Sequence, residues 1–171
     1  DVCDGDGGAY ECWDDSLVCS ENDCSSQPEA TLSFANITSS SADITYISDA
    51  DIWGFQFEVS NMVLVDCEAT PFNVSVTNGT VIAFSLTGET LPAGSGILAS
   101  LYFDEVSEPR FLEFEYLIVA GNEGIEFSTS GPDTTTVPGC FVDCAGICGG
   151  DAVLSGCDNT CGSDLVDDCA G

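Results

Sequence analysis

Ten of the eleven cysteines in this 171-residue chain lie close to its two ends, and only Cys67 lies between them. The chain has no histidine and the cysteine spacing is irregular, which favours disulfides in an oxidising compartment over zinc sites. We therefore predict two cross-linked, irregular terminal segments around a body that folds through its own core. The predicted disulfide cysteines are Cys3, Cys12, Cys19, Cys24, Cys140, Cys144, Cys148, Cys157, Cys161 and Cys169.

Composition divides the chain into three regions. Residues 1–29 and 139–171 are rich in Asp, Gly and Cys, whereas residues 30–138 contain short segments in which apolar and polar residues alternate. Such alternation, with turn residues between the segments, predicts an all-β antiparallel sandwich. Asn78-Gly79 predicts a hairpin turn between two of the strands. Core-facing side chains are predicted in three segments: Ile44, Tyr46 and Ser48; Trp53, Phe55, Phe57 and Val59; and Leu112, Phe114 and Tyr116.

The charge of the chain is strongly one-sided. Thirty residues are acidic and Arg110 is the single basic residue, which gives a formal net charge of -29. This balance argues against nucleic acid and anionic membranes as partners, because both require basic residues to meet phosphate. A compact chain of this charge repels itself and needs counter-ions, and oxygen ligands of irregular geometry suit Ca²⁺.

Two acidic groups are candidate Ca²⁺ ligands. "DGDGG" at the N-terminus resembles part of a calcium-binding loop, but its register fails at the first and twelfth positions of an EF-hand. A solvated acidic turn held by disulfides is the alternative. The candidate ligands are Asp4, Asp6, Asp14 and Asp15 in the first segment, and Asp158, Asp164, Asp167 and Asp168 in the last.

Three N-x-S/T sequons are candidate glycosylation sites, at Asn36, Asn73 and Asn78. Asn73 alternates with the apolar residues of its strand and is therefore expected to face outward, and Asn78 lies in the predicted turn. Asn36 shares the parity of Leu32 and Phe34, so it is accessible only if its strand ends or bulges first.

No catalytic constellation is recognisable. The chain has neither His nor Lys, and no serine is paired with a plausible base. Carboxylate pairs suffice for glycoside hydrolysis, but none lies in a recognisable frame. We therefore expect a protein that is not an enzyme.

The stretch from Ile52 to Phe103 resembles the cohesin family. The matching residues are "WGFQFEVS" at Trp53–Ser60 and "FSLTGETLPAGSGILASLYF" at Phe84–Phe103. The resemblance implies a jelly-roll β-sandwich of about nine strands. It also implies a non-enzymatic module that docks dockerins, with relatives in secreted surface proteins.

The terminal segments resemble the "DCAGxCGG" repeats of large secreted microbial surface proteins. "DCAG" occurs at Asp143–Gly146 and again at Asp168–Gly171, and joining the end of the chain to its start gives a similar continuation. This reading predicts a seam between consecutive units at which Cys169 and Cys3 lie close together. With eleven cysteines one thiol is left over; Cys67 is a candidate for it, or it bonds to a terminal segment.

Two functions remain open. The first is a structural repeat unit of an extracellular filament or tandem-repeat surface protein, assembled with copies of itself head to tail through Ca²⁺-binding joints. The second is a cohesin-type recognition module that binds a dockerin or a glycan. No apolar run reaches the length of a membrane-spanning helix, and no signal peptide is visible, so we expect a mature secreted chain or a segment of a longer product.

Overall fold

The computed structural model describes residue 3 and residues 9–155 and 160–162. Almost all regular structure in these residues is strand. The elements in chain order are β1 Tyr10–Glu11, β2 Leu17–Val18, η1 Glu21–Asp23, β3 Glu29–Ala35, β4 Ser41–Ser48, β5 Gly54–Ser60, β6 Leu64–Glu68, β7 Asn73–Thr77, β8 Thr80–Phe84, β9 Gly94–Phe103, β10 Arg110–Ala120, η2 Asn122–Gly124, β11 Ser128–Ser130, β12 Thr135–Val137, β13 Leu154–Ser155 and β14 Thr160–Cys161.

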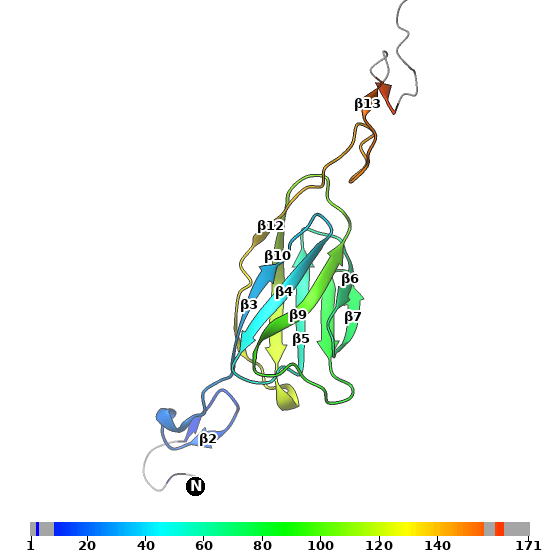
Figure 1. Cartoon of the computed structure of the whole chain (residues 1–171). Coiled ribbons are helices and arrows are strands. Elements are labelled where there is room, and N and C mark those ends of the chain that lie inside the picture. Colours follow the sequence, from blue (N-terminus) through cyan, green and yellow to red (C-terminus); the bar gives the residue numbers. More distant parts are fainter. Residues whose placement is uncertain (1–2, 4–8, 156–159, 163–171) are drawn as a thin grey trace, which may run out of the picture.

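The body is a sandwich of two five-stranded sheets (Figure 1). One sheet has the order β12-β10-β5-β8-β7 and the other has the order β11-β3-β4-β9-β6. The predicted all-β sandwich is therefore present. Two details differ from the expectation: β12 adds a short edge strand beside β10, and β11 pairs parallel to β3 while the other strand pairs are antiparallel.

The core lies between the two sheets and is built by the alternation read from the sequence. Every second residue of β4, from Ala42 to Ser48, is buried, and so are Phe55, Phe57 and Val59 of β5. Phe57 stacks on Phe114 of β10 with ring centroids 4.2 Å apart, and Phe34 of β3 meets Phe114 edge-on at 4.9 Å. These rings join the two sheets, because β3 belongs to one and β10 to the other.

Two predicted core positions are wrong. Tyr116 is 71 % exposed, because a bulge shifts the register of β10 against β5 between Glu115 and Ile118, and Tyr116 itself has φ 53°. One extra residue in a strand reverses the side to which the following side chains point. Trp53 precedes β5 and is only half-buried, whereas its neighbour Ile52 is fully buried.

The hairpin predicted at Asn78-Gly79 joins β7 to β8, with Thr77 opposite Thr80. Both turn residues have positive φ, 52° for Asn78 and 86° for Gly79. This is the conformation that a two-residue turn between right-twisted strands requires.

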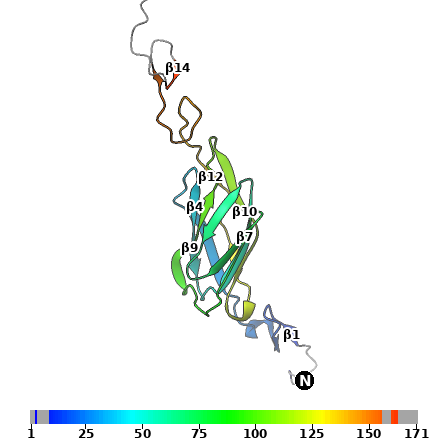
Figure 2. The same ribbon diagram turned by 90° about the vertical axis from the view of Figure 1, so that its right-hand side faces the viewer.

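The two terminal segments lie at opposite ends of the sandwich, as both views show (Figures 1 and 2). The N-terminal segment meets the sandwich beside η2, where the Gln27 side chain donates a hydrogen bond to the Glu126 carbonyl at 2.9 Å. We call this end the N-terminal pole. The C-terminal segment leaves from the other end, where the Cys140 amide donates to the Val106 carbonyl at 2.8 Å. We call that end the C-terminal pole.

Candidate functional site

Four disulfides hold the described parts of the terminal segments. Cys3 pairs with Cys19 and Cys12 with Cys24 in the N-terminal segment. Cys140 pairs with Cys148 and Cys144 with Cys161 in the C-terminal segment. Each bond closes a loop within its own segment. Cys3 is therefore bonded to Cys19, and Cys169, which is predicted to lie close to Cys3 of a neighbouring unit, is outside the described residues.

Asp143 organises the "DCAGICGGDA" motif. One carboxylate oxygen, Oδ1, accepts hydrogen bonds from the amides of Ala145 and Ile147, both at 2.9 Å, and Oδ2 accepts from the Ala152 amide at 3.2 Å. These hydrogen bonds, with that from Ile147 first, lower the pKa of Asp143 below its ordinary value. A carboxylate surrounded by N–H donors holds the loop by itself, so this motif does not need a cation at its centre.

The glycines of the same motif have steric roles. Gly146 has φ 80°, which a residue with a side chain rarely adopts. Gly150 packs against the Asp143 carboxylate so closely that a Cβ atom would collide with Oδ2. Each residue type of this motif thus has a structural role: Asp143 accepts the backbone hydrogen bonds, the cysteines form disulfides, and the glycines fit where a side chain would not.

Asp14 has a similar local role in the N-terminal segment. Its carboxylate accepts hydrogen bonds from the Ser16 hydroxyl at 2.5 Å and the Ser16 amide at 3.1 Å, and from the Ser25 hydroxyl at 3.3 Å. The hydrogen bond from the Ser16 side chain is the main cause of its lowered pKa. Asp14 is therefore ionised and fixed in orientation.

A pocket at the N-terminal pole places carboxylates from two parts of the chain on one surface. Asp14 and Asp15 come from the N-terminal segment, whereas Glu123 and Glu126 come from the stretch between β10 and β11. Trp13, whose indole N–H donates to the Ser25 carbonyl at 2.6 Å, lines the same pocket, which has a volume of about 520 Å³. The result is a strongly acidic, partly aromatic concavity.

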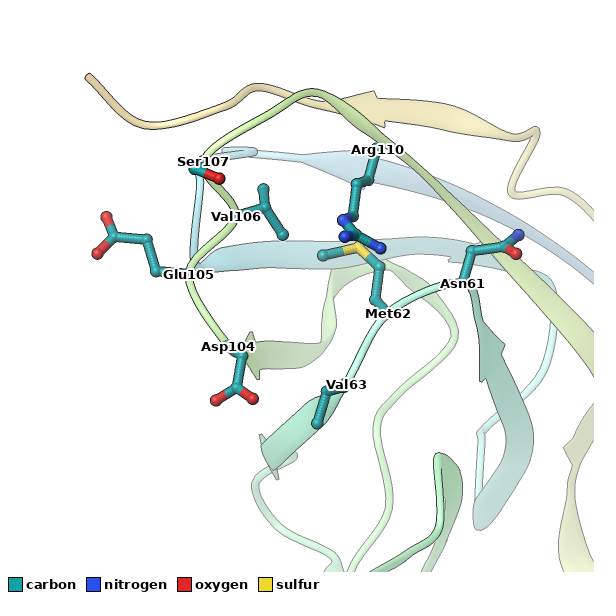
Figure 3. Close-up of a pocket in the computed structure, with 8 residues that line it drawn as sticks. All are labelled: Asn61, Met62, Val63, Asp104, Glu105, Val106, Ser107 and Arg110. Atoms are coloured by element: carbon teal, nitrogen blue, oxygen red, sulfur yellow. The ribbon is translucent and has the colours of Figure 1, made fainter. Parts of the chain in front are cut away.

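A second pocket, at the C-terminal pole, contains Arg110 (Figure 3). The loops before β6 and before β10 form its wall, and its volume is about 470 Å³. The guanidinium points into the pocket, whereas the side chains of Asp104 and Glu105 point away from it. No hydrogen bond or ion pair joins the guanidinium of Arg110 to another residue that the structure describes.

The predicted Ca²⁺ ligands are only partly within the described residues. Asp14 and Asp15 lie together at the N-terminal pole, and Asp4, Asp6, Asp158, Asp164, Asp167 and Asp168 lie outside the residues described. In the described part of the chain, only Glu105, Cys140 and Cys148 bring three potential ligand atoms within 4.8 Å of one another. The two sulfurs of that group form a disulfide, so it is not a metal site. The carboxylates described at the N-terminal pole thus do not converge as a compact ion cage would require.

Cys67 carries a free thiol in the core. It lies on β6, is 4 % exposed and has no disulfide partner. Burial, reinforced by the neighbouring charges of Asp66 and Glu68, raises its pKa to about 12. The thiol is therefore protonated at neutral pH and a poor nucleophile. Cys157 and Cys169 lie outside the described residues.

All three sequon asparagines are exposed. Asn36 was expected to be accessible only if its strand ended or bulged before it. β3 does end at Ala35, and Asn36 has φ 48°. Its side-chain amide donates a hydrogen bond to Asp43 at 2.7 Å, and this bond is the first cause of the lowered pKa of Asp43. Asn73 begins β7, and Asn78 lies in the hairpin turn.

Sequence reasoning missed the residues that shape the two poles. Asp143 was visible only as part of a repeated motif, and its side-chain hydrogen bonds depend on the folded loop. Glu123 and Glu126 are two acids among thirty, so nothing in the sequence associates them with Asp14. Arg110 carried a signal, because it is the only basic residue, but its pocket arises from loops distant in sequence.

No family model matches the chain, and comparison with curated proteins finds no similar sequence. Among solved structures, the chain is similar to the CaDoc0917–CaCohA2 complex, with 16% identity over 64% of this chain and 99% of that chain, at a TM-score of 0.48. It is also similar to a type I cohesin–dockerin complex from Clostridium thermocellum, at 11% identity over 66% and 92% of the two chains and a TM-score of 0.44.

A non-cellulosomal cohesin from Archaeoglobus fulgidus is similar at 10% identity over 65% of this chain and 89% of that chain, with a TM-score of 0.45. No helix in the described part of the chain is long and apolar enough to cross a membrane.

Proposed function

We propose that this chain is a structural unit of an extracellular filament or tandem-repeat surface protein, arranged end to end and without catalytic activity. The observation that carries this proposal is the placement of the disulfide-bonded segments at opposite poles of one sandwich (Figure 1). A chain that enters at one pole and leaves at the other adds a full module length per unit. Disulfides at both poles make these junctions resistant to unfolding, and they persist in an oxidising, extracellular environment.

Electron microscopy of native material tests this proposal. We expect rows of beads with a regular repeat that lengthen with the number of units. Reducing agent should loosen the junctions before it unfolds the sandwich, because the four bonds lie outside the body. Isolated globular monomers in native preparations would contradict the proposal.

Ca²⁺ is proposed as a counter-ion of the acidic terminal segments. The described carboxylates do not form a compact cage, so the support is the net charge of -29 together with the acidic terminal segments. N-glycans are proposed at the exposed sequons, with Asn73 and Asn78 the more accessible and Asn36 already hydrogen-bonded to Asp43. A mass decrease after treatment of native material with an N-glycosidase would support them, and an unchanged mass would refute them.

A recognition module that binds a dockerin or a glycan is the second candidate function. The favouring observation is an apolar cluster on the outer face of the β12-β10-β5-β8-β7 sheet. Ile82 of β8 and Ile118 of β10 lie on either side of Gln56 of β5, and Phe84 lies two residues along β8 from Ile82. These three side chains are 37 to 45 % exposed. Ile82→Glu should abolish capture of a dockerin panel without unfolding the protein, and a panel without any binder would remove the protein-recognition version of this candidate.

A further inference from the structure

We propose that Arg110 at the C-terminal pole binds the acidic pocket at the N-terminal pole of a second copy of this chain. This inference rests on the proposed end-to-end arrangement and specifies the contact that makes it. The two partners are the pocket of Figure 3 and the pocket lined by Trp13, Asp14, Asp15, Glu123 and Glu126.

The first step is the condition of Arg110. A lone cation among thirty acids would be expected to pair with one of them, yet no described carboxylate forms an ion pair with it. The two acidic residues that line the same pocket, Asp104 and Glu105, are directed away from it, and Glu105 accepts a hydrogen bond from the Ser39 hydroxyl at 3.0 Å. None of the residues that the structure describes accepts a hydrogen bond from the five donors of the guanidinium, which can therefore serve an external acceptor.

The second step is the shape of the acceptor. The described carboxylates at the N-terminal pole do not surround one metal ion, since no three of their oxygens lie within 4.8 Å of one another. A guanidinium differs from a metal ion because its donors spread over a planar fork and reach separated carboxylates. The Trp13 indole in the same pocket offers a face on which an arginine stacks.

The third step is the charge of the whole molecule. Two copies with a net charge of -29 repel each other in any orientation. The molecule is elongated, and contact between opposite poles keeps the two bodies farther apart than side-by-side contact does (Figure 2). Screening over about 8 Å at physiological salt then removes most of the repulsion between the bodies but leaves the local contact.

The fourth step is the symmetry of the contact. Arg110 and its acceptor lie at different poles, so each copy offers one of each. A contact between different surfaces that does not close on itself produces an open chain of molecules. The area of one pole is small, so the contact is weak between single chains and becomes effective when neighbours are already connected.

The test measures self-association of single recombinant chains by sedimentation velocity at protein concentrations approaching the millimolar range. Wild type should form dimers and longer species as concentration rises. Arg110→Gln and the double variant Glu123→Gln/Glu126→Gln should each remain largely monomeric. Glu58→Gln/Glu68→Gln removes the same number of charges from strands β5 and β6, away from both poles, and should associate like wild type.

A mixture of the two defective variants gives the decisive result. Arg110→Gln retains the acidic pocket and Glu123→Gln/Glu126→Gln retains Arg110, so together they should form dimers that cannot lengthen. Arg110→Lys should associate less than wild type, because an ammonium lacks the planar fork. Equal melting temperatures of all variants show that the fold is intact.

Association of Arg110→Gln equal to that of wild type would overturn the inference, and so would a wild type that stays monomeric or a mixture without dimers. The proposed function survives such a failure if native material still shows a beaded repeat. It falls only if that repeat is absent.

Discussion

Asp143 shows how one side chain can define a motif. Its carboxylate accepts three backbone N–H groups, so Asp143→Ala leaves the amides of Ala145, Ile147 and Ala152 without these acceptors. We expect several-fold faster hydrogen exchange at these amides, because local opening becomes easier. Asp151→Ala, at an exposed position nearby, is the matched control and should leave their exchange unchanged.

The same carboxylate gives the loop a pH dependence. The pKa of Asp143 is lowered in the folded loop, so its stabilising contribution is fully present above the ordinary aspartate pKa and is lost as pH falls through the lowered value. Protection of the three amides should therefore persist into acid in which a free aspartate is already protonated. Loss of protection at or above the ordinary aspartate pKa would contradict this assignment.

Cys67 should be chemically silent in the native protein. Its thiol is buried and its pKa is about 12, so the thiolate needed for alkylation is scarce at pH 8. Peptide mapping after treatment with iodoacetamide should find the Cys67 peptide unmodified in native protein and modified in guanidinium chloride. Rapid native labelling would show that β6 opens or that the thiol lies at the surface.

At the level of the strands, the stacked aromatic rings of β5 and β10 stabilise the sandwich. Phe57 is fully buried and stacks on Phe114, so Phe57→Ala should lower the free energy of unfolding by about 3–5 kcal/mol. Phe111 of β10 is 64 % exposed, and Phe111→Ala should change it by no more than about 0.5 kcal/mol. Urea unfolding curves of both variants provide the measurement, and equal effects would mean that the sheet faces are assigned wrongly.

The strands also show what the sequence could and could not predict. Alternation located the core of β4 and β5, because one residue in two must face the opposite sheet. It failed at Tyr116, where a bulge adds a residue without any local sequence signal. β12 was missed because three residues that pair only with β10 carry no pattern of their own. The carboxylates at the N-terminal pole could not be grouped from sequence, since Asp14 and Glu123 become neighbours only through the packing of the segment against the sandwich.

For the whole molecule, the balance of charge decides how the fold responds to its surroundings. Thirty acidic residues oppose one arginine, and the formation of a compact body brings these charges together. Self-repulsion then disfavours the folded state more than the extended chain. The free energy of unfolding should therefore rise with salt, because ions screen the repulsion over the whole molecule. Ions that bind a particular segment should add a second, specific contribution.

The two contributions can be separated by melting the protein at matched ionic strength. Sodium chloride should raise the melting temperature by screening, and Ca²⁺ should raise it further if it binds the folded terminal segments, because a ligand of the native state stabilises it in proportion to its occupancy. Substituting Asn for Asp158, Asp164, Asp167 and Asp168 should reduce the Ca²⁺ increment while leaving the sodium response. Substituting Gln for Glu58 and Glu89, which belong to the sandwich, should leave the Ca²⁺ increment intact. Equal melting temperatures in Ca²⁺ and in a chelator at the same ionic strength would mean that diffuse screening alone neutralises the terminal segments. The C-terminal segment would then be held without a metal, by its disulfides and by the hydrogen bonds to Asp143.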